Sequence, residues 1–173
     1  MMNERMQNAI NDQIKWELYS AYLYLSMSVW YASIGLKGFA QWERVQAQEE
    51  LAHAMKFLDY LNARGGRVAL QTVEAPPKDW KSPLEAFEFS LAHEKKVTGM
   101  IHDLVELAMA EKDHATYNML QWYVNEQVEE EENATEIVDK LRIIEGDRGK
   151  GMLYMLDKEL GARVFTPPAP AKE

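Results

Sequence analysis

The chain has 173 residues, of which 47% are hydrophobic and 27% charged, with a formal net charge of −9 and no cysteine. The length suits one domain with a sizeable core, and the lack of cysteine excludes disulfides and thiolate metal sites. The acidic balance disfavours nucleic-acid binding, which needs a basic face, and favours cationic partners such as metal ions. No stretch is apolar enough to span a bilayer or to form a signal peptide, so we expect a cytoplasmic protein with no membrane partner.

Helical periodicity, with almost no strand-like alternation, runs along most of the chain. It predicts long helices over residues 4–33, 39–64, 83–112 and 115–145, and a short helix over residues 152–163. The second and third helices are joined by an extended connection through Pro77. These lengths predict an all-α four-helix bundle of two antiparallel hairpins, with a long crossover between helices two and three and a short fifth helix. We expect one domain over residues 1–163 and a proline-rich tail over residues 164–173.

Each long helix places a polar side chain in the middle of its apolar face when it is projected at about 100° per residue. Glu17 occupies this position on the first helix, and Glu50 and His53 occupy it on the second. Glu94 does so on the third helix and Gln127 on the fourth. Every helix therefore carries a potential metal-ligand side chain toward the core.

The spacing of these residues is the same in both hairpins, since 50 − 17 = 33 and 127 − 94 = 33. His53 and Glu130 each follow three residues later, which puts them close to the same side of their helices. Burying several carboxylates without compensation is prohibitively unfavourable, and a bound cation removes that difficulty. Carboxylates with one imidazole suit iron or manganese, with zinc possible and copper less suitable.

Taken singly, these residues have simpler structural roles. A buried glutamate is more often paired with Lys or Arg, and a histidine on an apolar face is usually a hydrogen-bonded core residue; it is the matched register of four helices that favours a metal site. We assign His93, His102 and His114 to the surface or to packing. Tyr24, two turns or about 10 Å from Glu17, is a core tyrosine bonded to a carboxylate, a redox-active neighbour of the metals, or both.

The set Glu17, Glu50-x-x-His53, Glu94 and Gln127-x-x-Glu130, with Tyr24 and the segment LQWYVNEQVEEE, resembles a non-haem ferritin of the prokaryotic type. Ferritin-like carboxylate proteins are the known example of inward-facing Glu and Glu-x-x-His ligands in a helical bundle. This chain departs from the symmetric pattern of bacterioferritins, which has a second Glu-x-x-His where Gln127 and Glu130 stand. Leu51 lies near the position of their haem-binding methionine, so we expect no haem.

The resemblance implies iron storage and detoxification in a ferritin-like fold. Fe(II) would be oxidised to Fe(III) by O2 or peroxide at a di-iron ferroxidase centre, and ferric mineral would collect inside a homo-oligomeric cage of 24 subunits. In this scheme Glu17 and His53 hold the first iron and Glu50 bridges the two ions. Glu94 holds the second iron, with Gln127 close by.

Further carboxylates surround this set. Glu126, Glu129 and Glu130 share one side of the fourth helix, and Glu49 precedes Glu50. A solvated acidic face is the simpler interpretation of such a run. The resemblance instead implies a third iron site made by Glu49, Glu126 and Glu129, with Glu130 shared between it and the di-iron centre.

The second helix also has an apolar stripe away from the candidate metal face, formed by Leu51, Met55 and Leu58. A helix with two apolar faces is expected to pack against another subunit. The short fifth helix carries more apolar surface than an isolated tail should expose, in Leu153, Met155, Leu156 and Leu160. We expect it to dock at a symmetry axis.

Three other classes of protein share a helical bundle. A di-iron peroxidase of the rubrerythrin-like type normally adds a cysteine-ligated iron domain, and this chain has no cysteine. A mini-ferritin that coats DNA would lack the fifth helix and often has a basic arm. A non-enzymatic structural bundle would account for the periodicity but leaves the carboxylates in the core unexplained.

Overall fold

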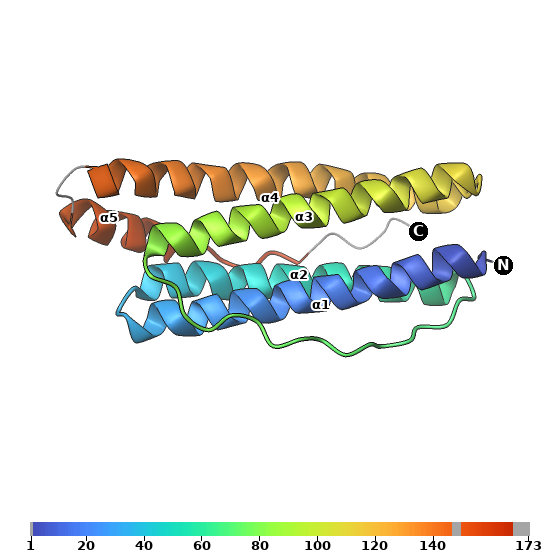
Figure 1. Ribbon diagram of the computed structural model, residues 1–173, viewed down its shortest axis with the longest axis horizontal. Coiled ribbons are helices and arrows are strands. Elements are labelled where there is room, and N and C mark those ends of the chain that lie inside the picture. Colours follow the sequence, from blue (N-terminus) through green and yellow to red (C-terminus); the bar gives the residue numbers. More distant parts are fainter. Residues whose placement is uncertain (1, 147–149, 168–173) are drawn as a thin grey trace. The chain divides into compact units, whose positions relative to one another are not determined.

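The computed structural model describes residues 2–146 and 150–167, and within them the chain forms five α-helices and no strand (Figure 1). The helices are α1 (Glu4–Ser33), α2 (Lys37–Ala63), α3 (Pro83–Ala110), α4 (His114–Gly146) and α5 (Lys150–Leu160). Residues 168–173 of the predicted tail, and residues 147–149 of the predicted break before α5, lie outside the described residues. No helix of the described part combines the length and the apolar character needed to cross a bilayer.

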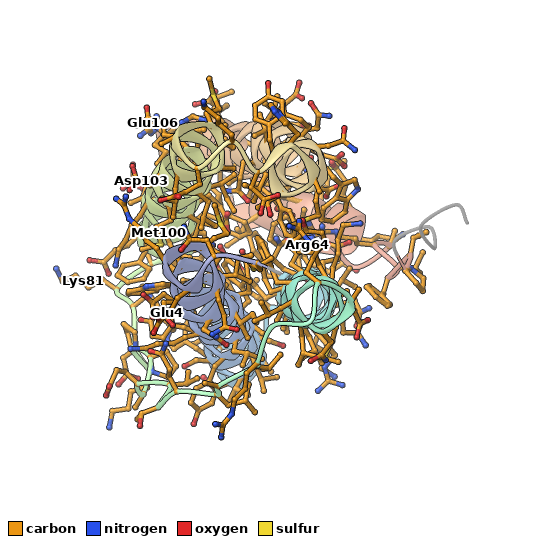
Figure 2. The ribbon with its side chains drawn as sticks, turned by 90° about the vertical axis from the view of Figure 1, so that its right-hand side faces the viewer. Glu4, Arg64, Lys81, Met100, Asp103 and Glu106 are labelled. Atoms are coloured by element: carbon orange, nitrogen blue, oxygen red, sulfur yellow. The ribbon has the colours of Figure 1, made fainter. Side chains whose placement is uncertain are left out.

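The chain divides into two compact units. The first unit comprises Met1–Ile10 and Trp80–Lys150 and so contains α3 and α4. The second comprises Asn11–Asp79 and Gly151–Glu173 and so contains most of α1, with α2 and α5. Charged residues of α3 such as Asp103 and Glu106 point outward in the view along the helices (Figure 2).

Helices α1 and α2 form an antiparallel hairpin in the second unit. The Ser28 hydroxyl donates to the Ala40 carbonyl (2.7 Å), whereas Glu17 faces His53, so later residues of α1 meet earlier residues of α2. The turn between the helices contains Gly35 with φ +84°, a left-handed conformation that glycine adopts without strain. The hairpin predicted for the first two helices is therefore confirmed.

The connection from α2 to α3 runs along α1. The Asn11 side chain donates to the Arg67 carbonyl (3.0 Å) and accepts from the Ala69 amide (2.7 Å), and further on Ser26 donates to the Pro77 carbonyl (2.6 Å). These contacts carry the segment from the first half of α1 to its second half, as the predicted crossover requires. Its backbone polar groups are thus partly satisfied by side chains of α1.

Helices α3 and α4 form the antiparallel hairpin of the first unit, because Glu94 contacts Gln127 while Glu88 contacts Arg142. Ser82 caps α3 by accepting from the Glu85 amide (3.1 Å), and Pro83 at the first helical position suits the fixed φ of proline.

The observed helix ends differ from the predicted ones by a few residues. Helix α3 ends at Ala110 instead of residue 112, because Lys112 takes a left-handed φ of +55° in the turn to α4. Helix α5 ends at Leu160, whereas the predicted helix continued to residue 163. After that end, the Arg163 amide closes a turn on the Leu160 carbonyl (3.2 Å) and the chain continues as an extended segment.

Helix α5 packs on the start of α2, where its side chain supplies a cap that the local sequence lacks. Leu36 precedes α2 and offers no capping side chain, but the Asp157 carboxylate accepts from the amides of Gly38 (2.8 Å) and Phe39 (3.0 Å). A Cβ atom at Gly38 would overlap the Asp157 carbonyl oxygen, and one at Gly161 would lie 3.2 Å from the Gly38 Cα. The two glycines allow the backbones to cross this closely.

Candidate metal centre

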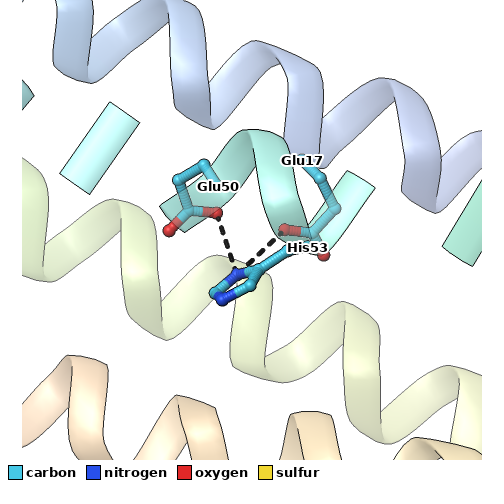
Figure 3. Close-up of side chains that lie close together, drawn as sticks. All are labelled: Glu17, Glu50 and His53. Atoms are coloured by element: carbon cyan, nitrogen blue, oxygen red, sulfur yellow. Dashed lines mark ion pairs between the residues drawn. The ribbon is translucent and has the colours of Figure 1, made fainter. Parts of the chain in front are cut away.

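The polar core of the second unit includes Glu17 from α1 with Glu50 and His53 from α2 (Figure 3). The exposed fraction is 2% for Glu17, 2% for Glu50 and 3% for His53, so three ionisable residues are buried together. His53 Nδ1 lies 3.5 Å from Glu50 Oε2 and 4.0 Å from Glu17 Oε2. One ligand atom from each residue falls within 4.8 Å of the others, a spacing that suits coordination of one cation. The sequence predicted these three residues to share the core, and they do.

Helical geometry explains why these side chains meet. Glu50 and His53 are three residues apart on α2 and therefore project from nearly the same side. The antiparallel pairing of α1 with α2 brings Glu17 to their level. Phe39 and Phe57 of the same helix are fully buried. The apolar surroundings lower the local dielectric and strengthen every charge interaction among the three.

Burial raises the pKa of Glu17 well above its ordinary value of 4.5. Loss of water is the largest cause, and the negative charge of Glu50 adds to it, while His53 and a hydrogen bond from Gln13 oppose it. Without a metal the carboxyl of Glu17 is therefore stabilised in its protonated form. A bound cation would reverse that preference and displace the proton.

Two glutamines orient the carboxylates. Gln13 Nε2 donates to Glu17 Oε1 (2.8 Å), and Gln46 Nε2 donates to Glu50 Oε1 (3.2 Å). Each glutamine precedes its glutamate by four residues on the same helix, the spacing that brings side chains together. Sequence reasoning did not identify these partners, although this spacing was a signal that could have found them. Such supporting hydrogen bonds fix the direction in which a ligand carboxylate presents its other oxygen.

The first unit contains the second predicted pair. Glu94 and Gln127 are both buried, and Gln127 Nε2 lies 3.1 Å from Glu94 Oε2, 3.2 Å from the Glu94 carbonyl and 3.2 Å from Thr98 Oγ1. Thr98 in turn donates to Glu131 Oε1 (2.6 Å). The Gln127 amide nitrogen is thereby held by α3, and the role of Thr98 was not predicted from the sequence.

The acidic residues of α4, and Glu49 on α2, differ in exposure. Glu130 is buried, Glu126 and Glu49 are half-buried, and Glu129 is exposed. Glu49 forms an ion pair with Arg163, whose Nη2 lies 2.5 Å from Glu49 Oε2. The run is therefore not a uniformly solvated face, since its members differ in their access to water.

The remaining sequence predictions concern tyrosine and histidine. Tyr24 is buried on α1, as expected for either of its proposed roles. His102 and His114 are exposed, and His93 is buried in α3, where loss of water and then the charge of Lys96 lower its pKa to about 4. All three fit the surface or packing roles predicted for them.

A further buried carboxylate was not predicted from the sequence. Glu43 is fully buried on α2, and its charge helps to raise the pKa of Tyr31, after burial itself.

Comparison with known proteins identifies the family. The ferritin-like domain matches residues 7–144. The bacterial non-heme ferritin of Bacteroides fragilis (strain 638R) is 44% identical over 163 residues, which cover 94% of this chain and all of that protein.

Solved structures agree with this assignment. An engineered closed form of the Archaeoglobus fulgidus ferritin is 60% identical to this chain, with a TM-score of 0.93. The match covers 96% of this chain and all of the ferritin chain. The open-pore ferritin of the same archaeon is also 60% identical with a TM-score of 0.93, over 95% of this chain and all of its own. These similarities confirm the predicted all-α, ferritin-like four-helix bundle with a short fifth helix, and they show that this chain belongs to the ferritin family.

Proposed function

We propose that this protein oxidises Fe(II) with O2 or peroxide at a di-iron centre and stores the ferric product inside an oligomeric cage. Iron storage is supported at the level of the family; the oxidation chemistry and the cage are our extension to this chain. The observation that carries the proposal is the buried trio Glu17, Glu50 and His53, whose ligand atoms lie within 4.8 Å of one another. Two carboxylates and an imidazole suit iron.

The proposed roles follow the resemblance. Glu17 and His53 hold the first iron and Glu50 bridges, while Glu94 holds the second with Gln127 near it. Each ferrous ion loses one electron, and the two electrons, together with two protons from the solvent, reduce O2 to hydrogen peroxide or hydrogen peroxide to two water molecules. The proton held by Glu17 is released when iron enters, since its carboxyl must ionise to act as a ligand. Tyr24, buried on the same helix, is proposed as a redox-active neighbour.

Charge balance provides a reason for turnover. Two ferrous ions carry four positive charges, and Glu17, Glu50 and Glu94 supply three negative ones, with Glu130 able to supply the fourth. Oxidation adds two positive charges that these ligands do not neutralise, and Gln127 contributes none. We propose that the excess charge favours movement of ferric iron through Glu130 toward a third site.

The third site of this proposal uses Glu49, Glu126 and Glu129. Its support is the graded exposure of these residues: Glu130 is buried, Glu126 and Glu49 are half-buried, and Glu129 is exposed. Such a gradient suits an ion that passes from a dry site toward water, because the cost of a carboxylate's charge falls as solvent access rises.

Assembly is proposed on separate grounds. Leu51 and Met55 of the predicted stripe on α2 are about half exposed. On α5, Met155 of the predicted apolar surface is exposed, together with Met152 and Tyr154, whereas Leu156 and Leu160 of that prediction are buried within the chain. Apolar side chains grouped on a surface mark a contact with another chain. We propose that they are covered in a homo-oligomer of 24 subunits.

One pair of measurements tests the proposal. Size-exclusion chromatography should give a mass far above the 20.0 kDa of a single chain. Addition of Fe(II) to the metal-free protein should consume O2 or peroxide faster than the same iron does in buffer. A monomeric protein, or oxidation no faster than in buffer, would contradict the cage or the ferroxidase activity, respectively.

A further inference from the structure

Arg163 lies beyond the end of α5, and its backbone is fixed on α2. The Gln41 side chain donates to the Arg163 carbonyl (3.3 Å), and the Arg163 amide donates to the Leu160 carbonyl (3.2 Å). All these residues belong to the second unit. The start of the C-terminal segment is therefore attached to the helix that carries Glu50 and His53.

The Arg163 guanidinium contacts three residues on one side of α2. Its carbon lies 4.2 Å from the centre of the Trp42 ring, Nη1 donates to Gln46 Oε1 (2.8 Å), and Nη2 pairs with Glu49 Oε2 (2.5 Å). Positions 42, 46 and 49 are spaced by four and three residues, so one side chain reaches all of them.

Partial burial strengthens this ion pair. The side chains of Arg163 and Glu49 are 20% and 21% exposed, less than half the value for the surface pair Arg142–Glu88, at 57% and 46%. Exposed ion pairs contribute little because water and salt screen them, and screening weakens as water is excluded. Glu49 is thus a carboxylate whose charge is already compensated by the protein.

Gln46 extends the contact to the buried trio. Its amide oxygen accepts from Arg163, and its amide nitrogen donates to Glu50 Oε1 (3.2 Å), with 1% of the residue exposed. Arg163 is therefore bonded directly to one candidate ligand and, through Gln46, to the next. A cation at Glu49 would meet the guanidinium on the same carboxylate, and the two positive charges would repel each other.

We propose that Arg163 is a positioning residue that acts as an internal counter-ion of Glu49, so that a metal ion binds there only after the Arg163–Glu49 ion pair opens. The inference rests on the third iron site proposed above and explains how that site can be weak. An ion held weakly at Glu49 is passed on to the mineral instead of being retained.

The test is a Zn²⁺ titration of the metal-free, full-length protein by calorimetry, because zinc binds such ligands without redox chemistry. Arg163→Gln should tighten the weakest Zn²⁺ binding step about tenfold, since the competing charge-assisted pair is gone. Arg142→Gln is the matched control, because it removes the same charge from an exposed ion pair with Glu88 on the other unit. It should leave all steps unchanged.

A second variant separates charge from structure. Arg163→Lys retains the positive charge beside Glu49 but not the planar fork that also reaches Gln46, so it should keep the weak affinity of the unmodified protein. Equal affinities in Arg163→Lys and Arg163→Gln would overturn the counter-ion role, as would Arg163→Gln matching Arg142→Gln. Circular dichroism checks that each variant is folded, and Arg163→Met, which also removes the charge and should tighten the weakest step in the same way, serves as the test if the Gln variant is not folded.

Glu49→Gln separates the inference about Arg163 from the third site itself. It should abolish the weakest Zn²⁺ step. If it does so while Arg163→Gln has no effect, the inference about Arg163 is wrong and the third site stands. If Glu49→Gln binds Zn²⁺ like the unmodified protein, Glu49 is not a ligand, and both the third-site assignment and the inference are wrong.

Discussion

The hairpin of α1 and α2 and the hairpin of α3 and α4 place polar residues in their cores at the same 33-residue spacing, yet with different chemistry. The first gathers three ionisable groups, Glu17, Glu50 and His53, and burial raises the pKa of Glu17. The second pairs the carboxylate of Glu94 with the neutral amide of Gln127, and Glu130 on α4 is a further buried carboxylate. The first arrangement is left with a charge conflict that a cation relieves, whereas Glu94 and Gln127 are joined by a hydrogen bond of their own.

The largest effect is expected from Glu50→Ala, which removes the proposed bridge from the first hairpin. Fast Fe(II) oxidation should fall by at least about 100-fold, because loss of even a supporting partner of a metal ligand typically costs roughly 10–100-fold. Stopped-flow absorbance after addition of Fe(II) measures the rate, and size-exclusion chromatography shows whether the assembly is kept. An unchanged initial rate would make the bridging assignment wrong.

Gln127→Glu makes the second hairpin resemble the first. The new carboxylate cannot donate a hydrogen bond to Glu94 as the Gln127 amide does, and its negative charge repels that of Glu94. The free energy of unfolding of the metal-free protein at pH 7 should therefore fall by about 1–3 kcal/mol. Zn²⁺ should restore more stability to this variant than to the unmodified protein.

The matched control for that change is Gln121→Glu, at a glutamine of the same helix that donates to the Tyr117 carbonyl in an exposed hydrogen bond. It should alter unfolding by about a few tenths of a kcal/mol. If Gln127→Glu is no more destabilising in urea than Gln121→Glu, then the second hairpin does not depend on the neutrality of Gln127.

The raised pKa of Glu17 predicts how stability varies with pH. In the metal-free folded protein Glu17 keeps its proton above 4.5, while the unfolded chain releases it, so the folded state binds more protons and stability falls as pH rises from 4.5 to the folded pKa. Glu17→Gln cannot ionise and should flatten this decline in urea unfolding measured with a chelator present. Glu106→Gln, on the exposed face of α3, should leave the decline as it is.

The smallest effect on oxidation is expected from Glu129→Gln, at the exposed end of the proposed route. Bound iron should fall from about three to about two ions per subunit while the fast phase persists, because two-metal chemistry needs only the neighbouring pair. Crystals soaked in ferrous salt would show the occupancy. If this variant still binds a third iron, Glu129 is not an iron ligand and belongs to a solvated acidic face.

Helical periodicity made much of this architecture predictable. The bounds of α1 match the prediction, and Glu17, Glu50 and His53 meet in the core, because a period of 3.6 residues fixes which side chains share a face. The hairpin partners followed from short turns.

Contacts between distant segments were not predictable in the same way. Asp157 and Arg163 act on α2 from more than a hundred residues away in sequence, and no period relates them to Gly38 or Glu49. Gln13 and Gln46 differ in this respect, because each lies four residues before its glutamate on the same helix, a spacing from which the hydrogen bond could have been predicted. The close approach of Gly161 to the Gly38 backbone is likewise visible only in the fold.

The cap that Asp157 places on α2 has a consequence for synthesis of the chain. Helices emerge from the ribosome in order, so α2 is made well before Asp157. Until then, the amides of Gly38 and Phe39 lack the Asp157 carboxylate that accepts their hydrogen bonds in the folded protein. The first turn of α2 is therefore less stable before Asp157 is made. The helix that carries Glu50 and His53 thus gains its full N-terminal order only after α5 has been made, which ties the order of the helix that carries these candidate metal ligands to an intact α5.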